Sequence, residues 1–203
     1  MMRKFLACLG LTVVAACVKP APENPRVVME TEKGEITLEL YPDKAPLTVA
    51  NFLRYVDEGA LDGGAFYRTT RPDNDPMIAV IQGGLWKPWE EGMDEDFEPP
   101  FPPIAHETTE VSGLTHGDGV ISMARDQPGT ASSEFFINVG ANPSLDFGGE
   151  RNPDGQGFAA FGKVISGMDV VAAIHAAPAQ EGESFAGQIL AEPVTINSVR
   201  REP

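Results

Sequence analysis

The sequence predicts a mainly β fold, a closed antiparallel β-barrel that is capped at its ends by two α-helices. Two observations support this expectation. Many short apolar or alternating stretches are separated by turn residues, and only two stretches have the period of a helix. With 203 residues and 42% apolar composition, the chain suits one domain with a substantial core.

The first predicted element is a β-hairpin. Residues 35–40 alternate strictly between polar and apolar side chains, which is typical of a half-buried strand. Residues 26–32 form the preceding strand, and Glu-Lys-Gly at residues 32–34 indicates the turn between them.

Two stretches are predicted to be helices. The first begins near Pro46, whose ring suits a first helical turn, and ends at Gly59. The second begins near Gly167 and ends before Pro178. The apolar positions at helical spacing are Val49, Phe52, Leu53 and Val56 in the first, and Met168, Val171, Ala172 and Ile174 in the second.

The remaining segments divide into strands and two long loops. Residues 86–119 are irregular and rich in proline, and we expect a surface excursion with one short strand near residues 103–108. Residues 142–157 are rich in Asn, Pro, Asp and Gly and form the second loop. Further strands are predicted at residues 77–82, 120–124, 134–139, 158–165 and 193–200.

The most informative stretch is GVISMARDQPGTASSEFFIN at residues 119–138. Two apolar runs flank a loop of Asp, Pro, Gly, Ser and Thr, which indicates a strand, a loop and a second strand. Together with the upstream FYR and VIQGG, these strands could form the walls of a shallow groove with apolar sides and few polar donors.

Four motifs in this order resemble the cyclophilin-type peptidyl-prolyl cis-trans isomerases, as bacterial members of that family. They are FYR at residues 66–68, QGG at 82–84, SMAR with SSEFFIN inside 119–138, and FAAFGKV at 158–164. The resemblance covers roughly residues 26–199. It implies an eight-stranded antiparallel barrel with a helix at each end, and rotation about X-Pro bonds as the activity.

This reaction needs no nucleophile, metal or cofactor. Amide resonance sets a barrier of roughly 18–20 kcal/mol, and a fixed donor near the proline nitrogen stabilises the twisted state over the planar one. The resemblance implies that the guanidinium of Arg68 is this donor, because Arg68 matches the Arg of the family's F-x-R motif. It also implies catalytic roles for Gln82, which would contact the substrate backbone, and for Phe136, the aromatic floor of the proline pocket.

The resemblance further implies a set of substrate-binding residues, in which Ala124 and Arg125 act through backbone groups. Because adjacent strand residues point to opposite faces, we expect one of Phe135 and Phe136 in the core and the other in the site. The substrate-binding set is Phe66, Val80, Ala124, Arg125, Glu134, Leu145 and Phe158.

Several positions depart from the family pattern, among them Glu134, Phe158 and Ala79. Glu134 replaces the usual Gln, and its carboxylate could either pair with Arg68 and hold it or compete with substrate. Phe158 stands where animal members carry His, and Ala79 stands where Phe is common, which thins one wall of the pocket.

Other functions are less well supported by the sequence. His106, Glu107 and His116 lack the HExxH spacing of a zinc protease, residues 152–156 fit a turn better than a Ca²⁺ loop, and no G-x-S-x-G occurs. The main alternative is a module that binds proline-containing chains with little or no catalysis, as a chaperone would.

The N-terminus is predicted to be a bacterial lipoprotein signal. Arg3 and Lys4 precede a short apolar run, and Val14 to Cys17 resembles a lipobox, with an ordinary signal peptide as the alternative. We therefore divide the chain into a signal peptide at residues 1–16, a tether at residues 17–25 that is lipidated at Cys17, and an isomerase domain at residues 26–203.

Charge and cysteine content restrict the partners. The formal net charge is −15, and no basic cluster follows the first few residues, so we expect no nucleic-acid partner. Cleavage before Cys17 would remove Cys8, and an intramolecular disulfide would then be impossible. We expect a monomer that acts on proline-containing polypeptides in the cell envelope. Its lipid anchor would hold it on the periplasmic or outer side of a membrane, the outer membrane if the host is Gram-negative.

Overall fold

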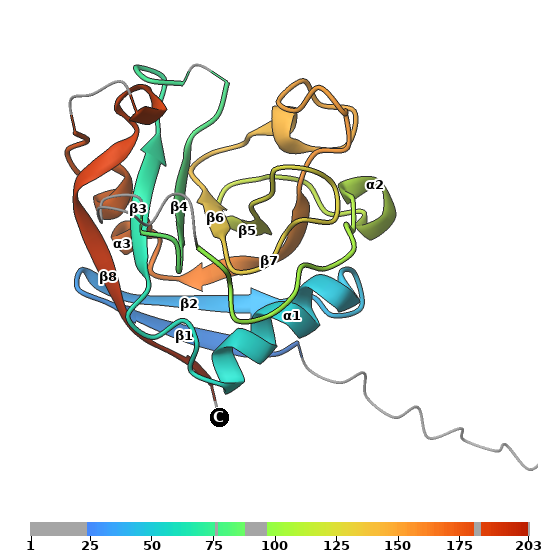
Figure 1. The fold of residues 1–203 in the computed structure, drawn as a ribbon, viewed down its shortest axis with the longest axis horizontal. Coiled ribbons are helices and arrows are strands. Elements are labelled where there is room, and N and C mark those ends of the chain that lie inside the picture. The colour runs from blue at the N-terminus through green and yellow to red at the C-terminus, as the bar shows by residue number, and fades with distance from the viewer. Residues whose placement is uncertain (1–23, 76, 88–96, 181–183, 203) are drawn as a thin grey trace, which may run out of the picture.

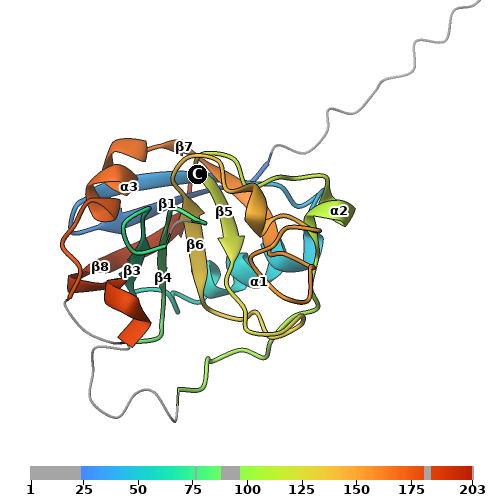
Figure 2. The same ribbon diagram turned by 90° about the horizontal axis from the view of Figure 1, so that it is seen from above.

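The structure is a computed structural model that describes residues 24–75, 77–87, 97–180 and 184–202. Eight strands form a closed antiparallel barrel in the order β1-β2-β7-β5-β6-β4-β3-β8 (Figures 1 and 2). The predicted barrel is therefore confirmed. The strands are β1 (Arg26–Thr31), β2 (Gly34–Leu40), β3 (Ala65–Thr70), β4 (Val80–Gly84), β5 (Val120–Met123), β6 (Phe135–Asn138), β7 (Ala159–Ser166) and β8 (Ile189–Arg201).

Two longer helices pack on the barrel, as expected, and a short one lies in the excursion. They are α1 (Pro46–Asp57), α3 (Met168–His175) and α2 (Thr109–Ser112), with single 3-10 turns η1 (Pro143–Leu145) and η2 (Ser184–Gly187). Of the described helices, none is long and apolar enough to span a bilayer.

The core fills the barrel with side chains from alternate strand positions. Phe52 of α1 meets Phe135 of β6 at 5.7 Å between ring centroids and Phe161 of β7 at 5.2 Å. Val171 and Ile174 of α3 are fully buried against the same core. Both helices therefore bury one apolar face, as their periodicity predicts.

The excursion differs from its prediction. The strand expected near residues 103–108 is absent, and this part of the chain is irregular up to α2. Pro102 and Pro103 have no N–H to donate to a ladder, and the backbone N–H of Ile104 bonds the carbonyl of Ala131 instead. Glu107 accepts hydrogen bonds from the backbone N–H groups of Leu47 and Thr48, so the excursion caps the N-terminus of α1.

Two strand boundaries also differ. β4 begins at Val80 rather than at residue 77, because the amide of Asn142 bonds the N–H of Ala79 at 2.8 Å and its carbonyl at 3.0 Å. β8 begins at Ile189, four residues before the predicted start, because Ile189 pairs with Arg68. The register between β3 and β8 shifts between the pair Phe66–Val194 and the pair Arg68–Ile189. This shift accommodates Pro193 within β8.

The predicted signal peptide, Cys17 and all but the last two residues of the tether lie outside the described residues.

Candidate active site

An apolar cluster separate from the barrel core lies on the outer face of β4 and β6. On β6, Phe135 and Ile137 point into the core, while Phe136 points outward, as the alternation of a strand requires. The Phe136 ring meets Phe158 edge-on at 5.3 Å. The cluster is Ile78, Val80, Phe136 and Leu145, with Ala124 and Phe158 packed against it.

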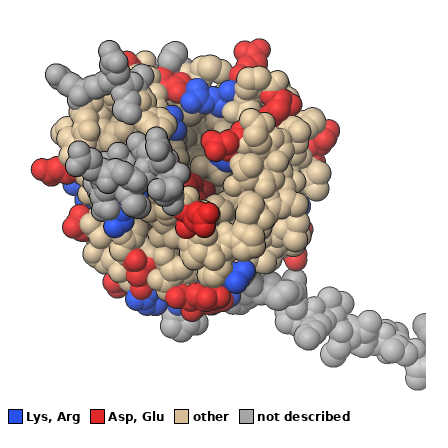
Figure 3. Space-filling model, viewed as in Figure 1, with Lys and Arg blue, Asp and Glu red and all other residues tan. Residues whose placement is uncertain are grey.

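This cluster forms one side of a cavity of about 560 Å³. Arg68, Gln82 and Glu134 line the same cavity, so charged and amide groups face an apolar wall. The space-filling view shows a hollow on this face, with basic and acidic side chains around it (Figure 3). A small apolar pocket with a few convergent polar groups is typical of a ligand-binding site.

Tyr67 and Arg68 both line the cavity although they are neighbours on β3. The register of β3 against β4 and against β8 shifts between Phe66 and Arg68, which marks a β-bulge at Tyr67. A bulge changes the direction in which side chains point, so two consecutive residues can face one side.

Phe66 does not reach the cavity, and its expected place in the substrate-binding set is wrong. Its side chain is fully buried in the barrel core and meets Phe135 at 5.7 Å. Phe66 precedes the bulge, so its side chain still follows the regular alternation of the strand and points inward.

Two glutamines hold the guanidinium of Arg68. Arg68 Nη1 donates to Gln82 Oε1 at 2.7 Å, while Nε and Nη2 donate to Gln188 Oε1 at 2.9 and 2.6 Å. Burial lowers the pKa of Arg68, but an arginine stays protonated at any physiological pH. The site therefore contains a fixed cation with known donor directions.

The hydrogen bonds continue from Gln82 to Tyr67 and Glu134. Gln82 Nε2 donates to the Tyr67 hydroxyl at 2.8 Å, and this hydroxyl donates to Glu134 Oε2 at 2.7 Å. Burial and the nearby Glu134 charge raise the pKa of Tyr67 well above its ordinary value, so the phenol remains a donor. This sequence of bonds sets the Gln82 amide with its oxygen toward Arg68.

Glu134 does not form an ion pair with Arg68, so the expectation that its carboxylate pairs directly with the guanidinium is wrong. Among the described residues its second oxygen, Oε1, accepts from the N–H of Leu85 at 2.8 Å, the N–H of Trp86 at 3.0 Å and the Ser133 hydroxyl at 3.0 Å. Burial raises the pKa of Glu134, and these donors oppose that shift.

The QGG motif makes room for this carboxylate. A Cβ atom on Gly84 would clash with the carboxylate of Glu134, and one on Gly83 would clash with the Ala65 carbonyl. Glycine is thus required at these positions by close approach, which links the motif to Glu134.

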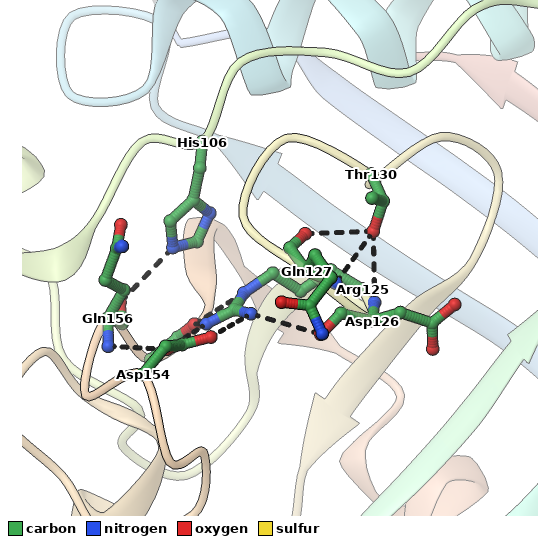
Figure 4. A network of polar contacts seen from close by, with 8 residues as sticks. His106, Arg125, Asp126, Gln127, Thr130, Asp154 and Gln156 are labelled. Carbon is green, nitrogen blue, oxygen red and sulfur yellow. Dashed lines mark hydrogen bonds and ion pairs between the residues drawn. The ribbon is translucent and has the colours of Figure 1, made fainter.

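The Arg125 side chain forms a clamp between two loops (Figure 4). Its Nη1 and Nη2 bond the two carboxylate oxygens of Asp154 at 2.8 and 2.9 Å, and its Nε and Nη2 donate to the Gly157 carbonyl at 2.9 and 2.6 Å. The hydrogen bonds from Arg125 lower the pKa of Asp154 to about 2. The clamp ties the loop before β7 to the end of β5 and places the guanidinium 5.3 Å from the Phe158 ring.

His116 contacts the pocket residue Phe136 and is itself held by two polar neighbours. Its ring stacks on Phe136 at 5.9 Å, Nδ1 lies 2.7 Å from Asp146 Oδ1, and Nε2 lies 3.1 Å from the Ser122 hydroxyl. This Ser-His-Asp arrangement is buried, with Ser122 fully inaccessible, so it offers no nucleophile to a substrate.

The other residues weighed as metal ligands are also engaged in the fold. His106 Nε2 lies 3.2 Å from the Gln156 carbonyl, and Glu107 caps α1. Within the described part of the chain, no group of three His, Cys, Asp or Glu side chains could hold a metal ion.

The structure therefore brings most of the expected residues together in one cavity. It also shows three residues in or next to the site that the sequence did not assign to it. Tyr67 lay inside a motif, but only its bulge turns it into the cavity. Gln188, which contacts Arg68, lies in a segment with no recognisable motif, and the sequence indicates His116, which stacks on Phe136, only as a possible metal ligand. The expected residues that line one cavity are Arg68, Gln82, Phe136, Val80, Ala124, Arg125, Glu134, Leu145 and Phe158.

Relatives are similar to this chain over most of its length. Peptidyl-prolyl cis-trans isomerase cyp18 of Streptomyces antibioticus is 38% identical over 176 residues, covering 86% of this chain and 96% of the relative. Peptidyl-prolyl cis-trans isomerase B of Escherichia coli is 38% identical over 146 residues, covering 71% and 80%.

Solved structures share the fold. A Cryptosporidium parvum cyclophilin-type isomerase superposes with a TM-score of 0.69 at 21% identity, covering 89% of this chain and 98% of its own. A second crystal structure of that protein, in the presence of the dipeptide Ala-Pro, has a TM-score of 0.67. The family model described as cyclophilin type peptidyl-prolyl cis-trans isomerase/CLD matches residues 26–201, and this chain therefore belongs to that family of enzymes.

Proposed function

We propose that this peptidyl-prolyl cis-trans isomerase holds a substrate proline against Phe136 and uses the Arg68 guanidinium to stabilise the twisted amide. One observation carries the proposal: Arg68, with its orientation fixed by two glutamines, lines the same cavity as the apolar Phe136 cluster.

The reaction needs such a donor because rotation removes amide resonance. At the twisted state the proline nitrogen regains its lone pair and accepts a hydrogen bond that the planar amide accepts poorly. Nη1 and Nη2 of Arg68 each carry a second N–H beyond their bonds to Gln82 and Gln188. A donor that binds the twisted state better than the planar one lowers the barrier, which is differential binding.

The apolar wall contributes in two ways. It would receive the proline ring of the substrate, and the presence of the dipeptide Ala-Pro with the Cryptosporidium parvum protein agrees with a proline-containing ligand. It also excludes water on one side of the amide, and a twisted amide is less polar than a planar one. Phe136, Leu145 and Val80 are almost fully buried, so packing against their neighbours holds this wall in place.

We further propose that the substrates are exported polypeptides and that the enzyme is a lipid-anchored monomer of the cell envelope. The support is the N-terminal pattern, in which an apolar run ends at Cys17 after Arg3 and Lys4. Globomycin should accumulate the precursor, and Cys17→Ser should release the protein from membranes. A mature N-terminus without acyl groups in mass spectrometry contradicts the anchor.

A direct assay tests the central proposal. The full chain should accelerate cis/trans exchange of a proline tetrapeptide, measured by exchange NMR, and EDTA should leave the rate unchanged. Binding of the same peptide without acceleration would favour the alternative, a binding module. Loss of the rate on EDTA treatment with recovery on zinc addition contradicts the metal-free mechanism.

A further inference from the structure

Gln188 lies between η2 and β8 in the chain and contacts the guanidinium of Arg68. Its side-chain oxygen accepts two hydrogen bonds from Arg68, from Nε at 2.9 Å and from Nη2 at 2.6 Å. The residue is only 7% exposed. Gln82 holds the guanidinium at the remaining nitrogen, Nη1, so the two glutamines grip it from two sides.

The Gln188 amide has one possible orientation. Its Nε2 donates to the Asn74 carbonyl at 3.1 Å, so its oxygen must face Arg68. Asn74 is itself fixed, since its Nδ2 donates to the Gly187 carbonyl at 3.2 Å and its Oδ1 accepts from the Arg71 N–H at 2.7 Å. The acceptor beneath Arg68 is therefore preorganised by the loop that follows β3.

A neutral acceptor suits this position. Arginine usually pairs with carboxylates, yet among the described residues the Arg68 guanidinium donates only to amide oxygens. An amide fixes the direction of the guanidinium without neutralising its charge. The cation is then oriented and still able to stabilise a developing lone pair.

We propose that Gln188 is a positioning residue for the isomerase reaction, which sets the Nη groups of Arg68 toward the proline nitrogen. This inference rests on the proposed role of Arg68 as the donor. A long side chain without its acceptor samples other rotamers, and a misplacement of about 1 Å can cost about 100-fold in rate.

The first test is Gln188→Met in the full chain, which keeps the length of the side chain and removes the acceptor. kcat/KM should fall by about tenfold to a hundredfold, mainly through kcat. The matched control is Gln180→Met, at an exposed residue of the same connection, which should leave kcat/KM unchanged. Equal activity of Gln188→Met and the control overturns the inference.

A double-mutant cycle separates positioning from simple support of the fold. In an Arg68→Ala background, adding Gln188→Met should leave the residual rate unchanged, because the guanidinium that it positions is gone. If the two losses multiply instead, Gln188 acts independently of Arg68 and the proposal is wrong.

A spectroscopic measurement does not depend on activity. The ¹⁵N order parameter of the Arg68 Nε–H should fall in Gln188→Met and in Gln188→Asn, whose amide is one methylene too short. It should stay unchanged in Gln180→Met. If the order parameter is equally high in all variants, the inference fails. If it falls while the wild-type chain shows no isomerase activity, the proposed function fails and the positioning contact stands.

Discussion

Tyr67 and Glu134 are joined by a hydrogen bond of 2.7 Å from the tyrosine hydroxyl to Oε2 of the carboxylate, and this bond connects Glu134 to Arg68 without direct contact. Tyr67 in turn accepts from Gln82, and Gln82 accepts from Arg68. The unusual carboxylate of this site therefore acts through two intermediates. From this geometry we expect Glu134 to orient Arg68 and not to sequester it.

Glu134→Gln is expected to lower activity. The carboxylate accepts on both oxygens, from Tyr67 on one and from two backbone N–H groups and Ser133 on the other. An amide offers one oxygen, so at least one buried donor loses its acceptor, at a cost of about 1–3 kcal/mol in unfolding free energy. We expect a lower melting temperature and a fall in kcat/KM of roughly threefold to tenfold.

The matched control is Glu110→Gln at an exposed residue of α2, which should change neither quantity. A rise in kcat/KM for Glu134→Gln would show that the carboxylate restrains Arg68, contrary to the geometry.

Arg68→Ala should abolish most of the activity and keep the fold. Removing a preorganised donor typically costs about 2.7–4 kcal/mol in transition-state stabilisation, or 10²–10³ in rate. Arg68→Lys should not restore it, because an ammonium cannot donate to Gln82 and Gln188 together from fixed directions. The measurements are kcat/KM by exchange NMR and the circular dichroism melting curve. Full activity in Arg68→Ala would rule out the proposed mechanism.

The barrel could be predicted from the sequence because its signals are local and repeated. Alternation in residues 35–40 fixed one strand of the hairpin, and strand period alone required Phe135 and Phe136 to face opposite sides. These patterns depend only on nearest neighbours along a strand.

The parts of the site that escaped prediction depend on tertiary structure. The bulge at Tyr67 arises from pairing with two other strands, so no pattern in FYR reveals that Tyr67 faces the cavity and Phe66 the core. Gln188 is 120 positions from Arg68, in a segment without periodicity or a motif. The roles of Arg68, Gln82 and Phe136 stay predictions until the variants are measured.

Asp154→Asn should loosen the loop before β7. The Arg125 bonds lower the pKa of Asp154 from its ordinary value of 3.8 to about 2, so the ionised form stabilises the fold above pH 4. This contribution is lost as the pH falls through the folded pKa. We expect the melting temperature of the wild type to exceed that of Asp154→Asn at pH 7, and the difference to vanish near pH 2.

The same variant should raise KM more than it lowers kcat, because Phe158 borders the proline wall and lies next to the clamp. Asp43→Asn, at an exposed residue of the turn before α1, serves as the control and should behave as the wild type. A difference that persists unchanged at pH 2 would show that the carboxylate charge is not responsible.

His116 should make the stability of the fold sensitive to mild acid. Burial lowers the pKa of His116, although the nearby Asp146 carboxylate favours the protonated form, so the folded protein holds a neutral ring at pH 7. In the unfolded chain the pKa is near 6.5. The unfolded state therefore binds more protons as the pH falls below about 6.5, and the folded state loses stability until the pH passes the lowered pKa of His116 in the folded state.

His116→Gln cannot titrate, so the difference in unfolding free energy between wild type and His116→Gln should shrink from pH 7 to pH 5. His106 also has a lowered pKa, through burial, and His106→Gln measured in parallel isolates its share. Because the His116 ring stacks on Phe136, peptide affinity of the wild type should stay level while the ring is neutral and weaken only below the lowered folded pKa, whereas the affinity of His116→Gln should stay level throughout. An equal pH dependence of affinity in both proteins would show that His116 does not support the proline wall.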